Sequence, residues 1–119
     1  DFPNSETVAT VIAEHYQSGG IVGAVCHGPA ALVGVEIDGA PLVAGKQVAA
    51  FTNEEEAAVE LTEVMPFLLE TKLRALGADL VTADNFAANV VVSGRLVTGQ
   101  NPASASGSAE AIVALIESE

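Results

Sequence analysis

The sequence predicts an α/β fold, a mostly parallel sheet with helices on both faces, and three observations support it. Helical and strand patterns alternate along the chain. The run at 21–25 is entirely apolar, as expected of a strand buried on both faces of a parallel sheet. The 119 residues, 12.0 kDa, suffice for one domain, so we expect a single domain over residues 1–119.

The first element is a helix that Asn4 or Ser5 can cap and that Gly19-Gly20 ends. A buried strand over 21–25 comes next. The apolar residues of the helix have helical spacing: Val8, Val11, Ile12 and Tyr16.

After the turn Cys26-His27-Gly28, a second helix is predicted from Pro29 to about residue 33. A turn-rich segment over 35–46 leads to a strand at 47–51 and to a helix that Thr52 or Asn53 caps. The remaining predicted elements are a helix at 66–76, a strand at 80–82, a hairpin of 90–92 and 96–98 around Ser93-Gly94-Arg95, and a closing helix at 109–116 that begins near 104–108.

The composition excludes several classes of function. Sixteen acidic residues against four basic ones give a net charge of −12, which repels nucleic acids and anionic membrane surfaces. No apolar run reaches the roughly 18 residues of a membrane span. A single cysteine cannot form an internal disulfide, and no Cys/His spacing indicates zinc. We therefore expect a cytoplasmic protein.

Cys26 is the candidate nucleophile because it lies where a buried strand turns directly into a helix. The small residues Ala24 and Gly28 flank it at the spacing that a strained nucleophile elbow needs. The amino end of the following helix would favour a thiolate and so predicts a low pKa for Cys26. The alternative is that Cys26 is a small buried apolar residue, which is the usual role of a lone cysteine.

His27 can act with Cys26, or it can be an ordinary loop histidine, and His15 is expected on a helix surface without a role. A Cys/His pair needs a third group that orients the imidazole. Glu54, Glu55 and Glu56 are candidates, but acids in a first helical turn also serve as caps. The pattern alone leaves this choice open.

Three segments resemble the DJ-1/PfpI superfamily, in its branch of Hsp31-like, glutathione-independent glyoxalases. They are 24–32 (AVCHGPAAL), 51–56 (FTNEEE) and 96–102 (LVTGQNP). The resemblance implies a flavodoxin-like, class I glutamine amidotransferase-like fold. It also implies that Cys26 is the nucleophile, His27 its partner and an oxyanion donor, and Glu56 the acid of a catalytic triad, with the loop 99–102 as structural support.

The resemblance further implies that this chain is the carboxy-terminal part of such a domain. Only three or four central strands are predicted, without an opening βαβ unit. An amino-terminal half would hold a carboxylate that hydrogen-bonds the cysteine and a glycine-rich oxyanion segment. Residues 1–119 alone are therefore expected to be a weak enzyme and prone to aggregate.

The implied reaction converts methylglyoxal, a small reactive aldehyde, to D-lactate without a metal or an organic cofactor, in a protein expected to form homodimers. Two other activities use the same elbow. One is a stress-related holding chaperone or redox sensor, and the other is a PfpI-like peptidase or amidase.

Overall fold

A three-stranded sheet lies at the centre of the computed structural model, which describes residues 1–118. Its strand order is β1-β7-β6, with β1 parallel to β7 and β6 antiparallel to β7. The predicted hairpin is confirmed, since β6 and β7 meet at the pair Ser93 and Leu96. The bounds are Val22–Val25 for β1, Val90–Ser93 for β6 and Leu96–Gly99 for β7.

Two smaller strand pairs complete the β-structure. β4 (Gln47–Val48) is parallel to β5 (Asp79–Leu80), and β2 (Glu36–Ile37) forms an antiparallel pair with β3 (Ala40–Pro41). The β4 strand also contacts β6 and β7, which brings the parallel pair beside the central sheet. The α/β class is confirmed, with both parallel and antiparallel pairing.

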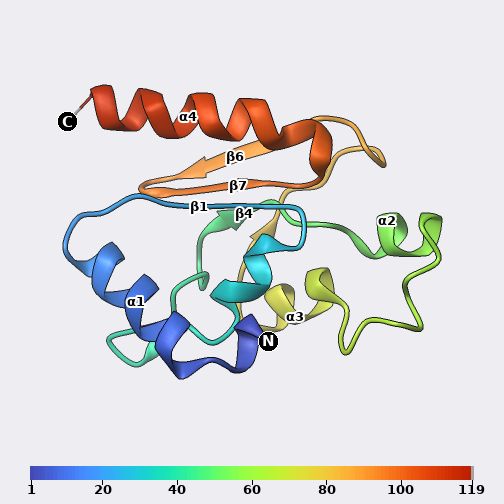
Figure 1. Cartoon of the computed structure of the whole chain (residues 1–119), viewed down its shortest axis with the longest axis horizontal. Helices are drawn as coiled ribbons and strands as arrows, with labels where there is room; N and C mark the ends of the chain where they lie inside the picture. Colours follow the sequence, from blue (N-terminus) through green and yellow to red (C-terminus); the bar gives the residue numbers. More distant parts are fainter. Residues whose placement is uncertain (119) are drawn as a thin grey trace.

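Helices lie on both sides of the central sheet (Figure 1). α4 (Ala105–Glu117) runs along one face and contacts β1, β6 and β7. The other three helices lie on the opposite side: α1 (Glu6–Gln17), α2 (Asn53–Ala58) and α3 (Leu69–Ala75). Three short 3-10 helices span Phe2–Asn4, Gly28–Leu32 and Pro102–Ser104.

Two glycines let α4 approach the sheet closely. A Cβ on Gly23 would lie 2.5 Å from Cδ1 of Ile112, and a Cβ on Gly99 would lie 2.6 Å from Oγ of Ser108. A side chain at Gly23 would force the Ile112 side chain to move, and one at Gly99 would also meet Cβ of Ser104 at 2.9 Å. The main hydrophobic core joins β1 and β7 to elements other than α4, and its large members include Leu32, Leu42, Leu69, Leu73 and Leu96.

The carboxyl end of α1 is attached to the β6–β7 hairpin by Arg95. Its guanidinium donates to the carbonyl oxygens of Tyr16 and Gly20 and stacks 4.1 Å from the centre of the Tyr16 ring. A cation at this end of a helix also stabilises the exposed carbonyl groups there. At the other end of α1, Oγ of Ser5 accepts from the backbone N–H of Val8, as predicted for the cap.

Several predicted boundaries are corrected. The helix predicted at 29–33 is the 3-10 helix Gly28–Leu32, and the helix predicted at 66–76 begins only at Leu69. The strand predicted at 47–51 ends at Val48 because the N–H of Ala49 donates to the side-chain Oγ1 of Thr98 in β7 and not to a backbone carbonyl of a neighbouring strand. The strand predicted at 80–82 is Asp79–Leu80.

The burial predicted for 21–25 is also wrong. Val22 is buried, but Gly23 is exposed and the next two residues are half-buried. The reason is that β1 forms an edge of the sheet, with β7 as its strand partner within residues 1–118. In the same described range, no helix combines the length and apolar character that crossing a membrane requires.

Candidate active site

The turn after β1 holds Cys26 in a strained backbone conformation. Its φ of 65° lies in the left-handed region, which a residue with a side chain rarely adopts. Two backbone hydrogen bonds maintain it: the N–H of Cys26 donates to Gly99 at 2.9 Å, and its carbonyl accepts from the N–H of Phe51 at 3.0 Å. The predicted sharp turn is therefore present, and its neighbours hold it from two sides.

His27 connects the cysteine to a buried acid. Its Nδ1 lies 3.4 Å from Sγ of Cys26, and its Nε2 lies 2.8 Å from Oε2 of Glu56. The carboxylate of Glu56 can only accept, so Nε2 carries the proton and Nδ1 is free to accept one from the thiol. The Glu56 side chain is 1% exposed and that of His27 37%, so the ring faces a buried anion on one side and accessible space on the other.

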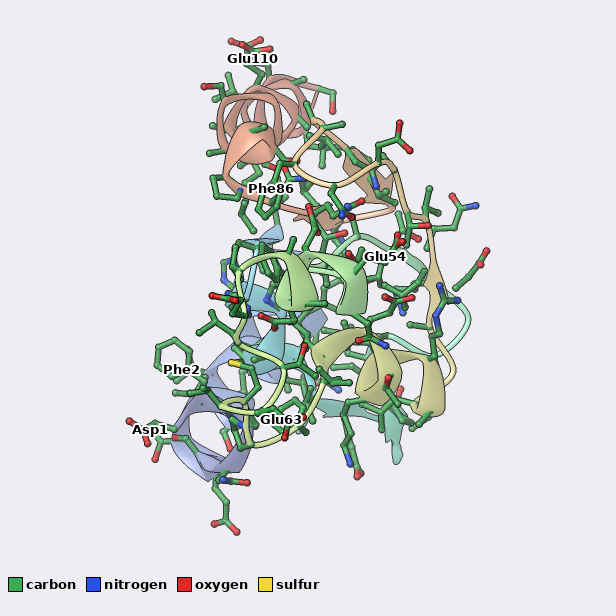
Figure 2. All side chains as sticks on the ribbon, turned by 90° about the vertical axis from the view of Figure 1, so that its right-hand side faces the viewer. Asp1, Phe2, Glu54, Glu63, Phe86 and Glu110 are labelled. Carbon is green, nitrogen blue, oxygen red and sulfur yellow. The ribbon has the colours of Figure 1, made fainter. Side chains whose placement is uncertain are left out.

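The three glutamates of α2 have different surroundings. Glu54 is exposed, and Figure 2 marks it on α2. Glu55 is buried and forms a capping box with Thr52, in which each residue hydrogen-bonds the other's backbone N–H. Glu56 is the one that contacts His27, so the contact predicted for it is present. Within residues 1–118, Oε1 of Glu56 has no hydrogen-bond partner.

The low pKa predicted for Cys26 is not what its surroundings produce. Burial raises the pKa of the thiol above its ordinary value, and the carboxylates of Glu55 and Glu56 raise it further. The backbone N–H of His27 hydrogen-bonds the sulfur and opposes these effects without outweighing them. The following helix is only five residues of 3-10 helix, so it contributes little dipole. A raised pKa favours the thiol form of Cys26 over the thiolate.

The loop 99–102 connects β7 to the acids of α2. Nε2 of Gln100 and Nδ2 of Asn101 both donate to the carboxylate of Glu55, at 3.1 and 2.9 Å, and all three side chains are fully buried. These bonds agree with a supporting role for the loop. The sequence offered no signal that Glu55 would be their common acceptor.

Aromatic contacts around His27 were also not predicted. The Phe51 ring lies 4.4 Å from the imidazole centre, and the Phe86 ring meets Phe51 edge-on at 5.8 Å. Phe51 begins the segment FTNEEE, one of the three that carry the family resemblance, so the sequence already placed it near the site. Phe86 lies in a loop without recognisable pattern and was missed; Figure 2 marks it close to α2.

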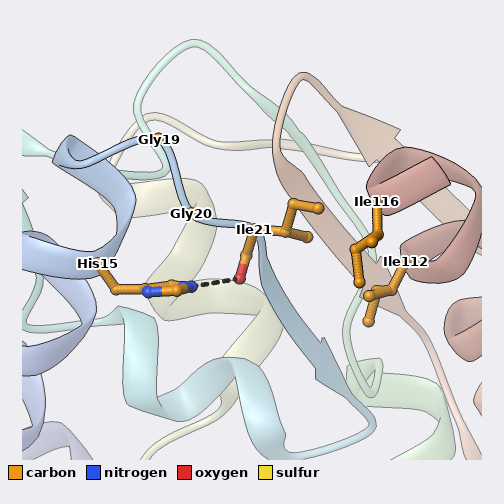
Figure 3. Close-up of a pocket in the computed structure, with 6 residues that line it drawn as sticks. All are labelled: His15, Gly19, Gly20, Ile21, Ile112 and Ile116. Atoms are coloured by element: carbon orange, nitrogen blue, oxygen red, sulfur yellow. Dashed lines mark hydrogen bonds between the residues drawn. The ribbon is translucent and has the colours of Figure 1, made fainter. Parts of the chain in front are cut away.

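A hollow of about 250 Å³ borders His27. Its wall is largely apolar and includes Ala30, Met65 and Phe67. A second hollow of about 280 Å³ lies at the other end of β1, between Ile112 and Ile116 of α4 and His15 of α1, whose Nε2 hydrogen-bonds the carbonyl of Ile21 (Figure 3). Among residues 1–118, no three acidic, His or Cys side chains gather in a way that could hold a metal ion.

Comparisons with known proteins find similarity in both sequence and fold. The family model of the DJ-1/PfpI family matches residues 1–115. Glyoxalase 3 of Candida albicans is 34% identical to this chain, over 98% of the chain and 52% of that protein. A probable glutathione-independent glyoxalase of Schizosaccharomyces pombe, hsp3103, is 37% identical over 92% of the chain and 46% of that protein.

The solved structures give the same result for the fold. The crystal structure of glyoxalase III from Candida albicans superposes with a TM-score of 0.90 at 32% identity, covering 96% of this chain and 51% of that one. The superposition supports the flavodoxin-like arrangement that the resemblance implied. The chain spans about half the length of the curated relatives it matches.

Proposed function

This chain belongs to the DJ-1/PfpI family, and on that premise we propose that it carries the nucleophile of a glutathione-independent glyoxalase, which converts methylglyoxal to D-lactate. The observation that carries the proposal is the series of contacts from Sγ of Cys26 through the His27 ring to Oε2 of Glu56, at 3.4 and 2.8 Å. Cys26, His27 and Glu56 are the residues to which we assign the chemistry.

The first step is addition of the sulfur to the aldehyde carbon. His27 takes the thiol proton of Cys26 on Nδ1, which lies 3.4 Å from the sulfur, as the C–S bond forms. The imidazolium that results has the buried carboxylate of Glu56 as its partner. The developing oxyanion takes this proton back from the imidazolium to give a hemithioacetal. We assign the backbone N–H of His27, which hydrogen-bonds the sulfur before the reaction, as one of the hydrogen-bond donors to the oxyanion.

The second step moves hydrogen between the two carbons. A base takes the proton from the former aldehyde carbon while the ketone oxygen takes one up, which gives an enediol. The neighbouring carbon then takes up a proton and the hydroxyl group on the sulfur-bearing carbon loses one, which gives a thioester of lactate. We propose that His27 and a carboxylate of the amino-terminal part carry these protons. Water then hydrolyses the thioester, which releases lactate and the Cys26 thiol. The overall reaction adds one water molecule to methylglyoxal with no net oxidation, so it requires no external oxidant or reductant. We propose that it needs no metal or organic cofactor.

The whole protein completes this site. We propose that residues 1–119 are the carboxy-terminal part of a single DJ-1/PfpI-like domain, and that an amino-terminal part supplies a carboxylate beside Cys26 and a second oxyanion donor. Loss of a positioned acid–base group costs about 10²–10⁴ in rate, and loss of an oxyanion donor about 10²–10³. We further propose a cytoplasmic homodimer with no nucleic-acid partner.

The test is lactate formation from methylglyoxal by the protein with its natural flanking sequence. Cys26→Ala is expected to lower kcat by about 10⁴-fold or more, as loss of a nucleophile does in a triad. Glu56→Gln is expected to lower it about 10²-fold, and Glu54→Gln is the matched control, since Glu54 is exposed on the same helix. Equal losses in the two glutamate variants would return Glu56 to a capping role, and an active Cys26→Ala variant would refute the proposal.

A further inference from the structure

Glu55 is a buried carboxylate that the proposed reaction does not use. It is fully buried, and the five groups that donate to it are all neutral. They are the backbone N–H and Oγ1–H of Thr52 at 3.0 and 3.2 Å, the N–H of Phe86 at 2.8 Å, Nε2 of Gln100 at 3.1 Å and Nδ2 of Asn101 at 2.9 Å. Burial alone would raise the pKa of Glu55, but these hydrogen bonds outweigh it and lower the pKa, so the group is an anion.

The two oxygens of the Glu55 carboxylate accept hydrogen bonds from different parts of the chain. Oε1 accepts from Thr52, which completes the capping box of α2, and from Gln100. Oε2 accepts from Phe86 and Asn101, which lie in two other segments of the chain. A cap needs only the bonds of Oε1 to Thr52. The bonds of Oε2 therefore point to a second role.

Each segment attached to Glu55 leads to a different member of the Cys26–His27–Glu56 group. The start of α2 carries Glu56 itself, and Gln100 follows Gly99, whose carbonyl accepts the N–H of Cys26. Phe86 meets the ring of Phe51, which in turn lies against His27. One carboxylate is thus the common acceptor for three segments that fix three reacting groups.

We propose that Glu55 is a positioning residue that holds Cys26, His27 and Glu56 in register through these three segments. As a statement about catalysis it rests on the glyoxalase function proposed above. A glutamine in its place has the same size, but its amide N–H₂ would face groups that also donate, and the Phe86 and Asn101 loops would separate from α2. The Phe51 ring would then lose its support, and His27 would lose its fixed orientation.

The experiment uses the protein with its natural flanking sequence and compares Glu55→Gln with Ser5→Ala. The second variant removes the Ser5 cap of α1, outside the contacts of Cys26, His27 and Glu56, and so reports the effect of cap loss by itself. The first readout is the NMR signal of the His27 ring protons, assigned by its loss in His27→Gln. The nearby Phe51 ring displaces this signal by its ring current. The second readout is kcat and KM for lactate formation.

In Glu55→Gln the His27 signal is expected to move toward the value of a freely exposed histidine, while Ser5→Ala leaves it in place. The kcat is expected to fall about 10- to 100-fold with KM changed less than about twofold, since a displacement of about 1 Å can cost 10²-fold. Phe86→Leu keeps the backbone bond to Glu55 but removes the ring contact, and it should move the His27 signal in the same direction. If Glu55→Gln fails to fold, the Phe86→Leu variant takes its place as the test. Phe86 is 42% exposed, so we expect this variant to fold.

An unmoved His27 signal in Glu55→Gln, or in Phe86→Leu where the first does not fold, overturns the proposal. An equal shift in Ser5→Ala also overturns it, because cap loss alone would then explain the result. If the parent protein forms no lactate but the His27 signal moves as expected, the positioning role stands and the glyoxalase function fails.

Discussion

The two ends of β1 each place a histidine beside a hollow of similar size, and their surroundings differ. At the amino end, Nε2 of His15 donates to the carbonyl of Ile21, next to a hollow of about 280 Å³. At the carboxyl end, His27 borders about 250 Å³ and lies between the sulfur of Cys26 and the carboxylate of Glu56. Both partners of His27 can gain or lose a proton, whereas the carbonyl partner of His15 cannot.

We propose the active site at the carboxyl end of β1 alone, because a hollow and a histidine do not by themselves supply a reactive group. The carbonyl of Ile21 holds the His15 ring in one tautomer and gives it no charged partner. The buried carboxylate of Glu56 lies 2.8 Å from Nε2 of His27, so His27 has an acidic partner, as the proposed transfer of the thiol proton requires. The difference between the two ends is the chemistry of the second partner.

The largest expected effect tests this contrast directly. His27→Gln removes the proton acceptor of Cys26 and should lower lactate formation by the whole protein about 10²–10⁴-fold. His15→Gln, the matched change at the other end of β1, should leave the rate within about twofold. Steady-state kinetics with methylglyoxal measure both variants. A comparable loss of rate in His15→Gln would mean that the amino end of β1 also takes part in lactate formation.

A smaller effect, on the free energy of unfolding, is expected from a change near the amino end of β1. Arg95→Met keeps the alkyl stem but removes the bonds to Tyr16 and Gly20 and the contact with the Tyr16 ring. The free energy of unfolding should fall by about 2 kcal/mol, since hydrogen bonds that involve a charged group contribute about 1.5–3 kcal/mol. Urea unfolding measures the change, with Lys72→Met on the exposed side of α3 as control. Alkylation of Cys26 should proceed as before, because the two ends are separate.

The smallest expected effect concerns the ionisation of Cys26. Since burial, Glu55 and Glu56 raise the pKa of this thiol, alkylation of the 119-residue chain by iodoacetamide should have its midpoint above the ordinary value of 9.0. A raised pKa in the folded state also means that this group stabilises the fold at neutral pH and loses that contribution as the pH rises through the pKa. A midpoint near neutrality would instead indicate the thiolate that the position of Cys26 before a helix predicted.

The local patterns of the sequence determined the elements and the position of the turn. The spacing of Val8, Ile12 and Tyr16 predicted α1, and Ser93-Gly94-Arg95 predicted the hairpin, because periodicity and turn chemistry depend on neighbouring residues. Cys26 after an apolar run predicted the strained turn for the same reason. The predicted ends of the strands at 47–51 and 80–82 were less accurate, because side chains from distant segments decide where a backbone N–H finds its acceptor.

The pattern of the residues alone left open which glutamate meets His27; the family resemblance indicated Glu56, and the tertiary structure shows the contact and its physical reason. Three consecutive acids on α2 look alike in sequence, and the separation lies in what each one faces: solvent for Glu54, five neutral donors for Glu55 and the imidazole for Glu56. The tertiary structure also decided the ionisation of Cys26, because burial and two carboxylates from a distant helix outweigh the local turn. Burial and charge act through space, so contacts between segments far apart in the chain set them.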